Sequence, residues 1–401
     1  MMTVAQAQRR LSECPKNKQP DAETVPLVMG LGRVASEDVF ASISIPPFDN
    51  SAMDGFALKA KELQAGRTHF DISQRIPAGS SPRPLLAGTA ARIFTGGMMP
   101  LGADTVVIQE DCEYTSHRVT VLQAVDFGGN VRPKGQDIHQ GARVIAQGQT
   151  LNPIDISLLA SIGCKEINVF KSITVALFST GDELVEAGAA LRPGQIYNSN
   201  RPLLVALCHQ LGYRVFDCGV IDDTLSATKD ALANAAQNAD VIISTGGVSV
   251  GEEDYVRPAL EELGELALWK VRMKPGKPVA FGNIGGVPLL GLPGNPVSSF
   301  IVFQLLGVPL LRGLQGQAKA EPLVYSVVAD FDKPASQREE YIRVKLSRDP
   351  QGQLIADHFV NLSSGVMSSL SWADGLVRQS IGVAISKGQL LDFLPLNGGV
   401  L

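Results

Sequence analysis

Hydrophobic and polar positions follow two alternating patterns between about residue 173 and residue 317. A continuous apolar run at residues 173–179 has the length of a β-strand that is buried on both faces, and residues 214–221 (RVFDCGVI) are predicted to form a second strand. Longer stretches at residues 200–211 and 225–239 place apolar side chains along one side of a helix. Because strands and helices alternate, this region is predicted to be a doubly wound α/β domain with a mostly parallel sheet.

The same alternation continues toward residue 317. It predicts a strand at residues 240–244, a helix at 255–263, strand-like runs at 268–273 and 287–290, and a closing helix at 297–311. The closing helix is the longest apolar run of the chain, but Ser298, Ser299 and Gln304 interrupt it. We therefore expect a buried core helix and no membrane span.

The rest of the chain has a different pattern. Residues 44–137 are rich in Thr, Val, Ile, Gly and Pro in short alternating runs, which predicts an inserted β domain. The flanking segments, residues 1–43 and 138–172, are expected to pack together as one segmented domain. Residues 318–401 form a second β region, where YIRVKL, the turn DPQG and LIADHFV predict a hairpin. The predicted fold class is therefore α/β plus β, in a multi-domain chain with its α/β domain at residues 173–317.

Composition and charge exclude several classes of protein. With 401 residues, 45% apolar and 19% charged, the chain has the values of a multi-domain globular protein. A formal net charge of −5 argues against nucleic-acid binding, which needs a basic face. No apolar segment follows the amino-terminal charges, so we expect a cytoplasmic protein. The five cysteines show no C-x-x-C spacing and the histidines number five, so neither disulfides nor a zinc site is indicated.

Polar loops follow the predicted strands, and the carboxyl ends of parallel strands meet at one edge of a sheet. These loops are TGDEL (180–184), IDDT (221–224), STGGVSVGEED (244–254), KPGKP (274–278) and GLPGNPVS (291–298). They supply acceptors for Mg²⁺ or ribose hydroxyls, cationic donors for an oxyanion, and glycines whose amides can approach an anion. The acceptors are Asp182, Glu183, Asp222, Asp223, Glu252, Glu253 and Asp254. The cationic donors are Lys274 and Lys277, and the glycines are Gly246, Gly247 and Gly251. Taken alone, each loop is more typical of a helix cap, a turn or a solvated loop, so only their convergence favours a nucleotide or phosphate site.

Three further polar segments lie upstream of the α/β domain. SIPPFDNSAMDGFA (44–57) contains turn-forming pairs that would present Asp49 and Asp54 while its aromatic residues anchor the loop. IFTGGMMPLGADTVV (93–107) and PKGQDI (133–138) are also rich in turn formers. All three are compatible with ordinary connections of a β domain.

These motifs together resemble the MoeA family. PPFDNSAMDGFA, IFTGGMMPLGADTVVIQED, KGQDI, ALFSTGDEL, GQIYNSN, STGGVSVGEEDY, KPGKP and GLPGNPVS occur in the family's order and spacing, over residues 24–298. The pattern is also similar to the E domains of plant and animal molybdenum-cofactor proteins, including gephyrin. The resemblance implies four parts: a small segmented domain, an inserted β domain, a MogA-like α/β domain and a C-terminal β barrel. It also implies an elongated homodimer whose active site lies between the α/β domain of one subunit and the upstream β domain of the other.

The resemblance also implies roles for residues of this chain. Asp54, Lys274 and Lys277 are expected to be catalytic, and Asp54, Glu183, Asp223 and Asp254 to hold Mg²⁺. Substrate-binding positions are expected at Thr95, Asp137, Glu183, Asp223, Asp254, Gly246, Gly247, Pro278, Pro293, Pro296, Ser298, Arg343 and Ser364. Arg338 is an alternative to Arg343 in the oxyanion site.

The activity implied by the resemblance is the insertion of molybdate into adenylylated molybdopterin with release of AMP. Two alternatives remain open: a molybdopterin adenylyltransferase, and a non-catalytic pterin-binding scaffold. The implied partners are a second copy of the chain, a MogA-type adenylyltransferase and maturation factors of molybdoenzymes. Neither a nucleic acid nor a membrane is expected as a partner. Molybdate and tungstate are not distinguished, because both are tetrahedral oxyanions of nearly equal size.

Overall fold

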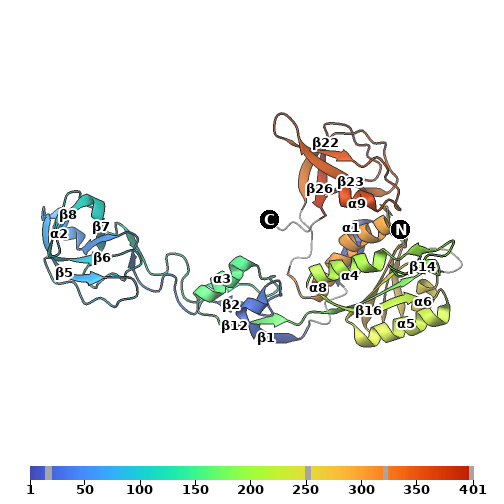
Figure 1. Ribbon diagram of the computed structural model, residues 1–401, viewed down its shortest axis with the longest axis horizontal. Coiled ribbons are helices and arrows are strands. Elements are labelled where there is room, and N and C mark those ends of the chain that lie inside the picture. Colours follow the sequence, from blue (N-terminus) through green and yellow to red (C-terminus); the bar gives the residue numbers. More distant parts are fainter. Residues whose placement is uncertain (14–19, 249–253, 319–323, 397–401) are drawn as a thin grey trace.

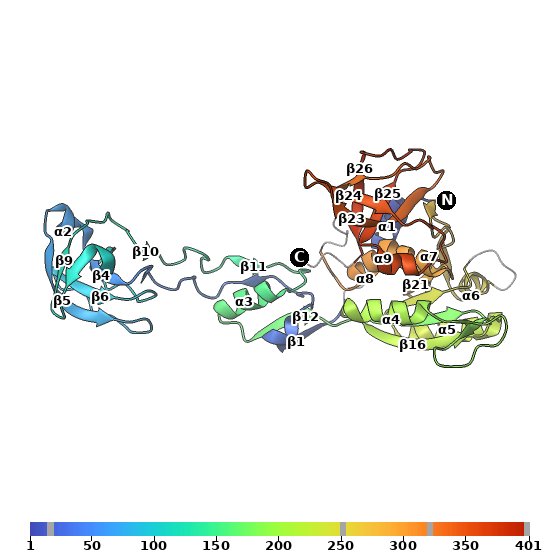
Figure 2. The same cartoon turned by 45° about the horizontal axis from the view of Figure 1, so that its top comes forward.

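The fold was analysed in a computed structural model of residues 1–401, which describes all but residues 14–19, 249–253, 319–323 and 397–401. The chain is elongated (Figure 1). A β domain lies at one end, a small domain in the middle, and the α/β and C-terminal domains together at the other end. Two antiparallel segments, bridged at Ile45 and Ile138, connect the β domain to the small middle domain (Figure 2).

A six-stranded sheet in the order β16-β13-β17-β21-β20-β18 forms the centre of the α/β domain. Its four parallel strands are β13 (Thr174–Thr180), β16 (Arg214–Ile221), β17 (Val241–Thr245) and β21 (Val287–Leu292). Two strands with antiparallel pairings, β20 (Ala280–Ile284) and β18 (Glu265–Trp269), complete it. The short pair β14 (Leu184–Val185) and β15 (Ile196–Tyr197) lies beside the sheet. The strands predicted at residues 173–179, 214–221, 240–244 and 287–290 are thereby confirmed.

Helices cover both faces of this sheet, as a doubly wound fold requires. Val175 and Leu177 of β13 face one core, together with Leu204 and Cys208 of α4 (Asn200–Gln210). Ala176 and Phe178 face a second core formed with α5 (Leu225–Asn238) and α6 (Val256–Leu263). The period-2 alternation of a strand buried on both faces accounts for this division.

The sequence did not predict β20, and it placed the preceding strand at residues 268–273 although β18 ends at Trp269. The β20 sequence AFGNI contains a glycine and an asparagine, which weaken the strand pattern. Gly282 is required there by close approach, because a Cβ would lie 2.3 Å from the backbone oxygen of Glu265. Gly282 therefore weakens the strand pattern of β20 in the sequence and also allows β18 to pair with β20.

The predicted closing helix is one apolar helical run with a π-helical middle. It consists of α7 (Pro296–Val302), the π segment η4 (Phe303–Gly307) and α8 (Val308–Leu314). Among the described residues, this run of 19 residues is the one helix long and apolar enough to cross a membrane, but it is mostly buried inside the protein. Its burial fits the predicted core helix.

The first helix, α1 (Val4–Glu13), packs on this closing helix. Val4, Ala7 and Leu11 belong to the same buried cluster as Phe303 and Leu306. Residues 1–43 were expected to fold with the segmented domain, whereas this part of them lies on the α/β domain. An apolar helix face carries no information on which domain will cover it, so the sequence could not place α1.

The middle domain joins two segments of the chain across the insertion. Its elements are β1 (Ala22–Pro26), η2 (Leu27–Gly30), β2 (Val39–Phe40), β11 (Arg143–Ile145), α3 (Pro153–Ser161) and β12 (Glu166–Phe170). β1 pairs with β12 and β2 with β11, so each sheet draws one strand from each segment. A capping box of Asn152 and Asp155 fixes the start of α3.

The inserted domain contains a six-stranded sheet in the order β7-β4-β6-β5-β9-β8. Its elements are β3 (Asn50–Ser51), β4 (Gly55–Leu58), α2 (Ala60–Gln64), β5 (His69–Ile76), β6 (Thr89–Ile93), β7 (Thr105–Ile108), η3 (Gln109–Asp111), β8 (Cys112–Tyr114), β9 (Arg118–Val121) and β10 (Val131–Arg132). The β character predicted for this region is confirmed.

The C-terminal domain is a closed five-stranded barrel, because β23 pairs with both β24 and β25. Its elements are β22 (Tyr325–Ala329), β23 (Glu339–Arg348), β24 (Leu354–His358), α9 (Ser368–Trp372), β25 (Gly375–Gln379) and β26 (Leu390–Pro395). The predicted hairpin is confirmed as β23 and β24. A short strand from the α/β domain, β19 (Met273–Lys274), pairs with β23 and places the KPGKP loop against the barrel.

Candidate functional site

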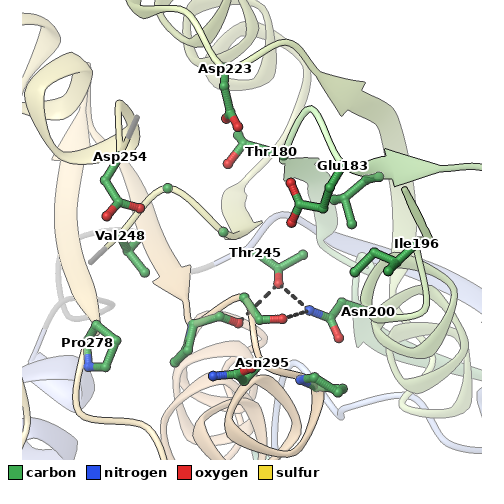
Figure 3. Close-up of a pocket in the computed structure, with 17 residues that line it drawn as sticks. Thr180, Glu183, Ile196, Asn200, Asp223, Thr245, Val248, Asp254, Pro278 and Asn295 are labelled. Atoms are coloured by element: carbon green, nitrogen blue, oxygen red, sulfur yellow. Dashed lines mark hydrogen bonds between the residues drawn. The ribbon is translucent and has the colours of Figure 1, made fainter. Parts of the chain in front are cut away.

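The loops at the carboxyl edge of the α/β sheet enclose a pocket of about 740 Å³, here called the sheet-edge pocket (Figure 3). It is lined by Thr180, Gly181, Glu183, Leu184, Ile196, Asn200, Asp223, Thr245, Gly246, Gly247, Val248, Asp254, Pro278, Pro293, Gly294, Asn295 and Pro296. The structure therefore brings together eight of the residues that the resemblance assigned to the substrate: Glu183, Asp223, Asp254, Gly246, Gly247, Pro278, Pro293 and Pro296.

Two glycines shape one wall of the sheet-edge pocket. Gly246 and Gly247 have φ angles of +94° and +65°, which L side chains rarely adopt. A Cβ on Gly246 would lie 2.5 Å from the backbone oxygen of Thr180, and one on Gly247 would lie 2.8 Å from a methyl group of Val256. The loop after β17 can therefore approach β13 only because both positions are glycine.

A buried amide links three elements at the floor of the pocket. Asn200 Nδ2, at the start of α4, donates to Thr245 Oγ1 at 2.9 Å and to the Gly294 carbonyl at 2.6 Å (Figure 3). Asn200 Oδ1 and Thr180 Oγ1 are buried and make no hydrogen bond within the described part of the protein. Because buried polar atoms are rarely left without a partner, these two oxygens favour a polar ligand in the pocket.

Three carboxylates face the sheet-edge pocket from different loops: Glu183, Asp223 and Asp254. Asp223 Oδ2 accepts the backbone N–H of Asp182 at 3.2 Å, and Asp182 Oδ1 accepts that of Asp223 at 3.2 Å. Within the described ranges, no group of three or more His, Cys, Asp or Glu side chains could hold a metal ion. The expected set of Asp54, Glu183, Asp223 and Asp254 is thus not assembled within one chain. Gly251, Glu252 and Glu253 lie outside the described residues.

A second pocket of about 360 Å³, here called the barrel-side pocket, lies where the KPGKP loop meets the barrel. It is lined by Lys274, Pro275, Gly276, Lys277, Pro278, Asn295, Ser298, Arg338, Glu340, Tyr341, Arg343, Leu362, Ser363 and Ser364. The structure thus joins Lys274, Lys277 and Ser298 of the α/β domain to both candidate arginines and Ser364 of the barrel. Pro278 and Asn295 line both pockets, so the two are contiguous.

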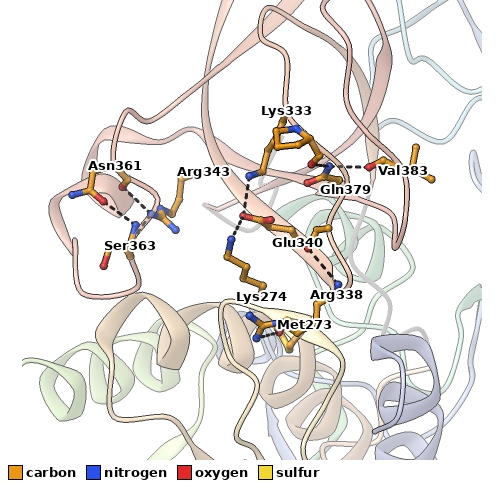
Figure 4. Close-up of polar contacts among 12 residues, drawn as sticks. Met273, Lys274, Lys333, Arg338, Glu340, Arg343, Asn361, Ser363, Gln379 and Val383 are labelled. Atoms are coloured by element: carbon orange, nitrogen blue, oxygen red, sulfur yellow. Dashed lines mark hydrogen bonds and ion pairs between the residues drawn. The ribbon is translucent and has the colours of Figure 1, made fainter.

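The charge of the barrel-side pocket is set by four cationic side chains, Lys274, Lys277, Arg338 and Arg343, and by the carboxylate of Glu340. Figure 4 labels all of these except Lys277, together with the neighbouring Lys333. Glu340, only 3% exposed, accepts ion pairs from Lys274 and from Lys333, each at 3.3 Å. Arg338 donates to the Met273 carbonyl at 3.2 Å. Glu340 is thus neutralised in part by Lys333, which lies outside the lining. The four cations of the lining therefore leave the pocket with a net positive charge, as an anion site requires.

Arg343 is the most deeply buried cation of the barrel-side pocket. It lies on β23, is 1% exposed, and donates from Nη2 to the carbonyls of Asn361 at 3.1 Å and Ser363 at 3.2 Å. Its Nε is buried and makes no hydrogen bond within the described residues. Burial lowers the pKa of this guanidinium, while the nearby Glu340 raises it. A buried N–H of a cation without a partner favours an anionic ligand.

The upstream candidates lie in and beside the inserted domain. Asp54 Oδ1 accepts both the backbone N–H and the hydroxyl of Thr95, each at 2.8 Å. These two bonds lower the pKa of the Asp54 carboxyl. Asp137 lies on the connection to the middle domain, where its backbone N–H donates to Ile45. In both views the inserted domain lies at the far end of the molecule from the α/β domain (Figures 1 and 2), so one chain does not bring Asp54, Thr95 or Asp137 to either pocket.

Several lining residues were not predicted as site residues. Asn200 and Thr180 were noted only within the motifs GQIYNSN and ALFSTGDEL, and Glu340 was not singled out. Their burial distinguishes them, and burial of a single polar residue leaves no signature in the sequence.

Three family models match the chain in order. The MoeA N-terminal region (domains I and II) matches residues 2–163, a probable molybdopterin-binding domain matches residues 176–313, and the MoeA C-terminal region (domain IV) matches residues 327–396. Together they cover most of the chain.

Similar proteins agree with these matches. A molybdopterin molybdenumtransferase of Haemophilus influenzae is 36% identical over 88% of both chains, and one of Nostoc sp. is 38% identical over 81% of this chain and 77% of its own. Two solved structures of the molybdopterin biosynthesis MoeA protein of Pyrococcus horikoshii superpose with TM-scores of 0.83 and 0.85. They are 31% and 26% identical to this chain, covering 99% and 98% of it and 99% and 100% of their own chains. The chain therefore belongs to the MoeA family, whose curated relatives are molybdopterin molybdenumtransferases.

Proposed function

We propose that this protein is a molybdopterin molybdenumtransferase that inserts molybdate into adenylylated molybdopterin and releases AMP. Its place in molybdenum cofactor biosynthesis follows from the family. The observation that carries the finer proposal is the contiguity of the two pockets through Pro278 and Asn295. One pocket has the size and mixed polarity of a nucleotide-like site, and the other is smaller and cationic.

The barrel-side pocket is the proposed molybdate site. Molybdate is a dianion and the dithiolene is electron-rich, so bringing them together requires donors that offset their repulsion. Lys274, Lys277 and Arg343 supply charge, and Ser298 and Ser364 are positioned to supply hydroxyl donors. An oxyanion held here would lie beside Pro278 and Asn295, at the boundary with the sheet-edge pocket.

The sheet-edge pocket is the proposed site of the adenylylated pterin. The backbone amides near Gly246 and Gly247 would donate hydrogen bonds to its phosphates. Asn200 Oδ1 and Thr180 Oγ1 would form hydrogen bonds with polar groups of the ligand. Mg²⁺ commonly binds through one or two carboxylates together with substrate phosphates, so an incomplete protein ligand set fits an ion that arrives with the substrate. One or two of the carboxylates Glu183, Asp223 and Asp254 would hold it together with the substrate phosphates, and it would neutralise phosphate charge there.

The complete site is proposed to form between two subunits of a homodimer. Asp54, whose ionised form is stabilised by Thr95, would reach the sheet-edge pocket of the partner subunit. The middle domain exposes large apolar side chains at Val28 (71%), Met29 (64%), Leu31 (55%) and Ile154 (77%), on η2, the residue that follows it, and α3. Apolar residues gathered on neighbouring elements of a small domain are typical of a subunit interface.

A direct assay tests the proposed activity. Purified protein given adenylylated molybdopterin, Mg²⁺ and molybdate is expected to release AMP and retain molybdenum in the pterin product. AMP release that ignores molybdate would contradict molybdenum insertion. Turnover of ATP with metal-free pterin would instead support the adenylyltransferase, and ligand binding without turnover would support a scaffold. The proposal also includes a cytoplasmic location and delivery of the substrate by a MogA-type adenylyltransferase and of the product to molybdoenzyme maturation factors.

Replacing Lys277 tests the placement of the oxyanion. A Lys277→Ala variant is expected to bind molybdate about ten- to a hundredfold more weakly, because one hydrogen bond from a charged group contributes roughly 1.5 to 3 kcal/mol. Titration calorimetry of the purified protein with molybdate measures the change. Lys345→Ala, a lysine exposed on the barrel strand β23 and outside the lining of the barrel-side pocket, is the matched control. Equal affinities of the two variants would place the molybdate elsewhere.

A further inference from the structure

A third pocket, of about 510 Å³, lies beside the barrel-side pocket, with which it shares two lining residues, and is here called the outer pocket. It is lined by Met1, Arg272, Lys277, Gln337 and Arg338. Among these described lining residues three have a cationic side chain, Arg272, Lys277 and Arg338, and none has an anionic side chain. Lys277 and Arg338 also line the barrel-side pocket, so these two side chains form the wall between the two spaces.

The outer pocket is built on hydrogen bonds that fix its arginines. Arg272 donates from Nε to the Gln337 carbonyl at 3.0 Å, and Arg338 donates from Nη1 to the Met273 carbonyl at 3.2 Å. The backbone at Arg272 is held on both sides, because its N–H donates to Met2 at 2.7 Å and its carbonyl accepts from Glu339 at 3.1 Å. Each guanidinium has further N–H groups beyond the one that fixes it, and these can donate to an anion in the pocket.

We propose that the outer pocket is an antechamber that binds a tetrahedral oxyanion and passes it to the barrel-side pocket. This inference rests on the proposed function of the barrel-side pocket as the molybdate site. Positive potential at a cavity mouth raises the local concentration of an anion and its rate of capture. Lys277 is exposed and lies on both spaces, so its flexible side chain can follow the anion from one pocket to the other.

The antechamber makes a prediction specific to Arg272, which lines the outer pocket and not the barrel-side pocket. An Arg272→Gln variant is expected to raise the KM for molybdate about five- to tenfold at low ionic strength, with a much smaller change in kcat, because capture and not chemistry is affected. Raising the salt concentration should shrink the difference from wild type. Arg272→Lys, which keeps the charge, should recover most of the loss. Arg348→Gln is the matched control, because it removes an exposed barrel arginine that also donates to a carbonyl.

Crystallography with tungstate tests the site independently of catalysis. Crystals of the full chain soaked in tungstate are expected to show anomalous scattering from tungsten in the outer pocket of wild type and not of Arg272→Gln. Sulfate competition in the AMP assay shows whether the antechamber accepts tetrahedral dianions in general, which the proposal expects. An unchanged KM and salt dependence in Arg272→Gln, with no tungsten in the wild-type outer pocket, would overturn the antechamber. If wild type instead fails to release AMP, the proposed function is wrong, while tungsten in the outer pocket would still establish an oxyanion site.

Discussion

An Asp54→Ala variant is expected to fold and dimerise but to release AMP at least about a hundredfold more slowly than wild type, because a positioned carboxylate typically contributes that much or more to such a step. The side chain lies in a loop, and its Oδ1 accepts two hydrogen bonds from Thr95. Those bonds fix the carboxylate and lower its pKa, so that the ionised form is presented. Steady-state AMP release, with size-exclusion chromatography for the assembly, measures both expectations.

Two further variants separate the charge of Asp54 from its structural bonds. Asp54→Asn can still accept both bonds from Thr95, so a comparable loss in this variant would assign the effect to the charge. Asp71→Ala removes a carboxylate from the same domain, where Asp71 is 72% exposed and pairs with Arg118 at 3.0 Å. It should retain wild-type activity. AMP release by Asp54→Ala at the wild-type rate would remove this residue from the mechanism.

An Arg343→Met variant is expected to lose molybdate binding by about a hundredfold or more without losing stability. Desolvating a guanidinium is costly, so an apolar side chain of similar length removes that cost together with the two hydrogen bonds, and we expect the two effects on stability to offset each other. The two carbonyls it would leave, those of Asn361 and Ser363, belong to exposed residues and can bind water instead. Calorimetry with molybdate and urea unfolding curves measure the two effects.

The contrast between these two effects is the informative result. If Arg343 served only to hold the Asn361–Ser363 loop, binding and the free energy of unfolding would fall together. Arg343→Lys adds a finer test, because lysine keeps the charge but lacks the planar fork of donors and should recover only part of the affinity. Full molybdate affinity in Arg343→Met would contradict a role for the barrel in the oxyanion site.

The α/β domain was predictable because its signals are local. The strands β13 and β17 are mainly apolar runs, and α4 and α5 have one apolar face each. β20 was missed because the glycine that permits its close pairing also weakens its pattern. The position of α1 could not be predicted either, since an apolar face does not specify which domain will cover it.

One pocket of the candidate site could be predicted from the sequence pattern, and the other could not. Topology alone predicted that the loops after β13, β16, β17 and β21 meet at one edge, and the sheet-edge pocket lies there. The barrel-side pocket joins Lys277 to Arg343 and Ser364 of another domain, and no periodicity in the sequence relates residues of separate domains. Only the resemblance to the MoeA family grouped those residues in advance. Asn200 and Glu340 escaped prediction because their importance depends on burial.

The central claim is that the active site is completed across two subunits, and mixed dimers test it most directly. Subunits carrying Asp54→Ala and subunits carrying Arg343→Met, each inactive alone, are co-expressed with different tags, and the heterodimer is purified. One of its two sites then combines an intact Asp54 loop with an intact oxyanion pocket, so about half of the wild-type AMP release per dimer is expected. A heterodimer as inactive as its two parents would contradict a site shared between subunits.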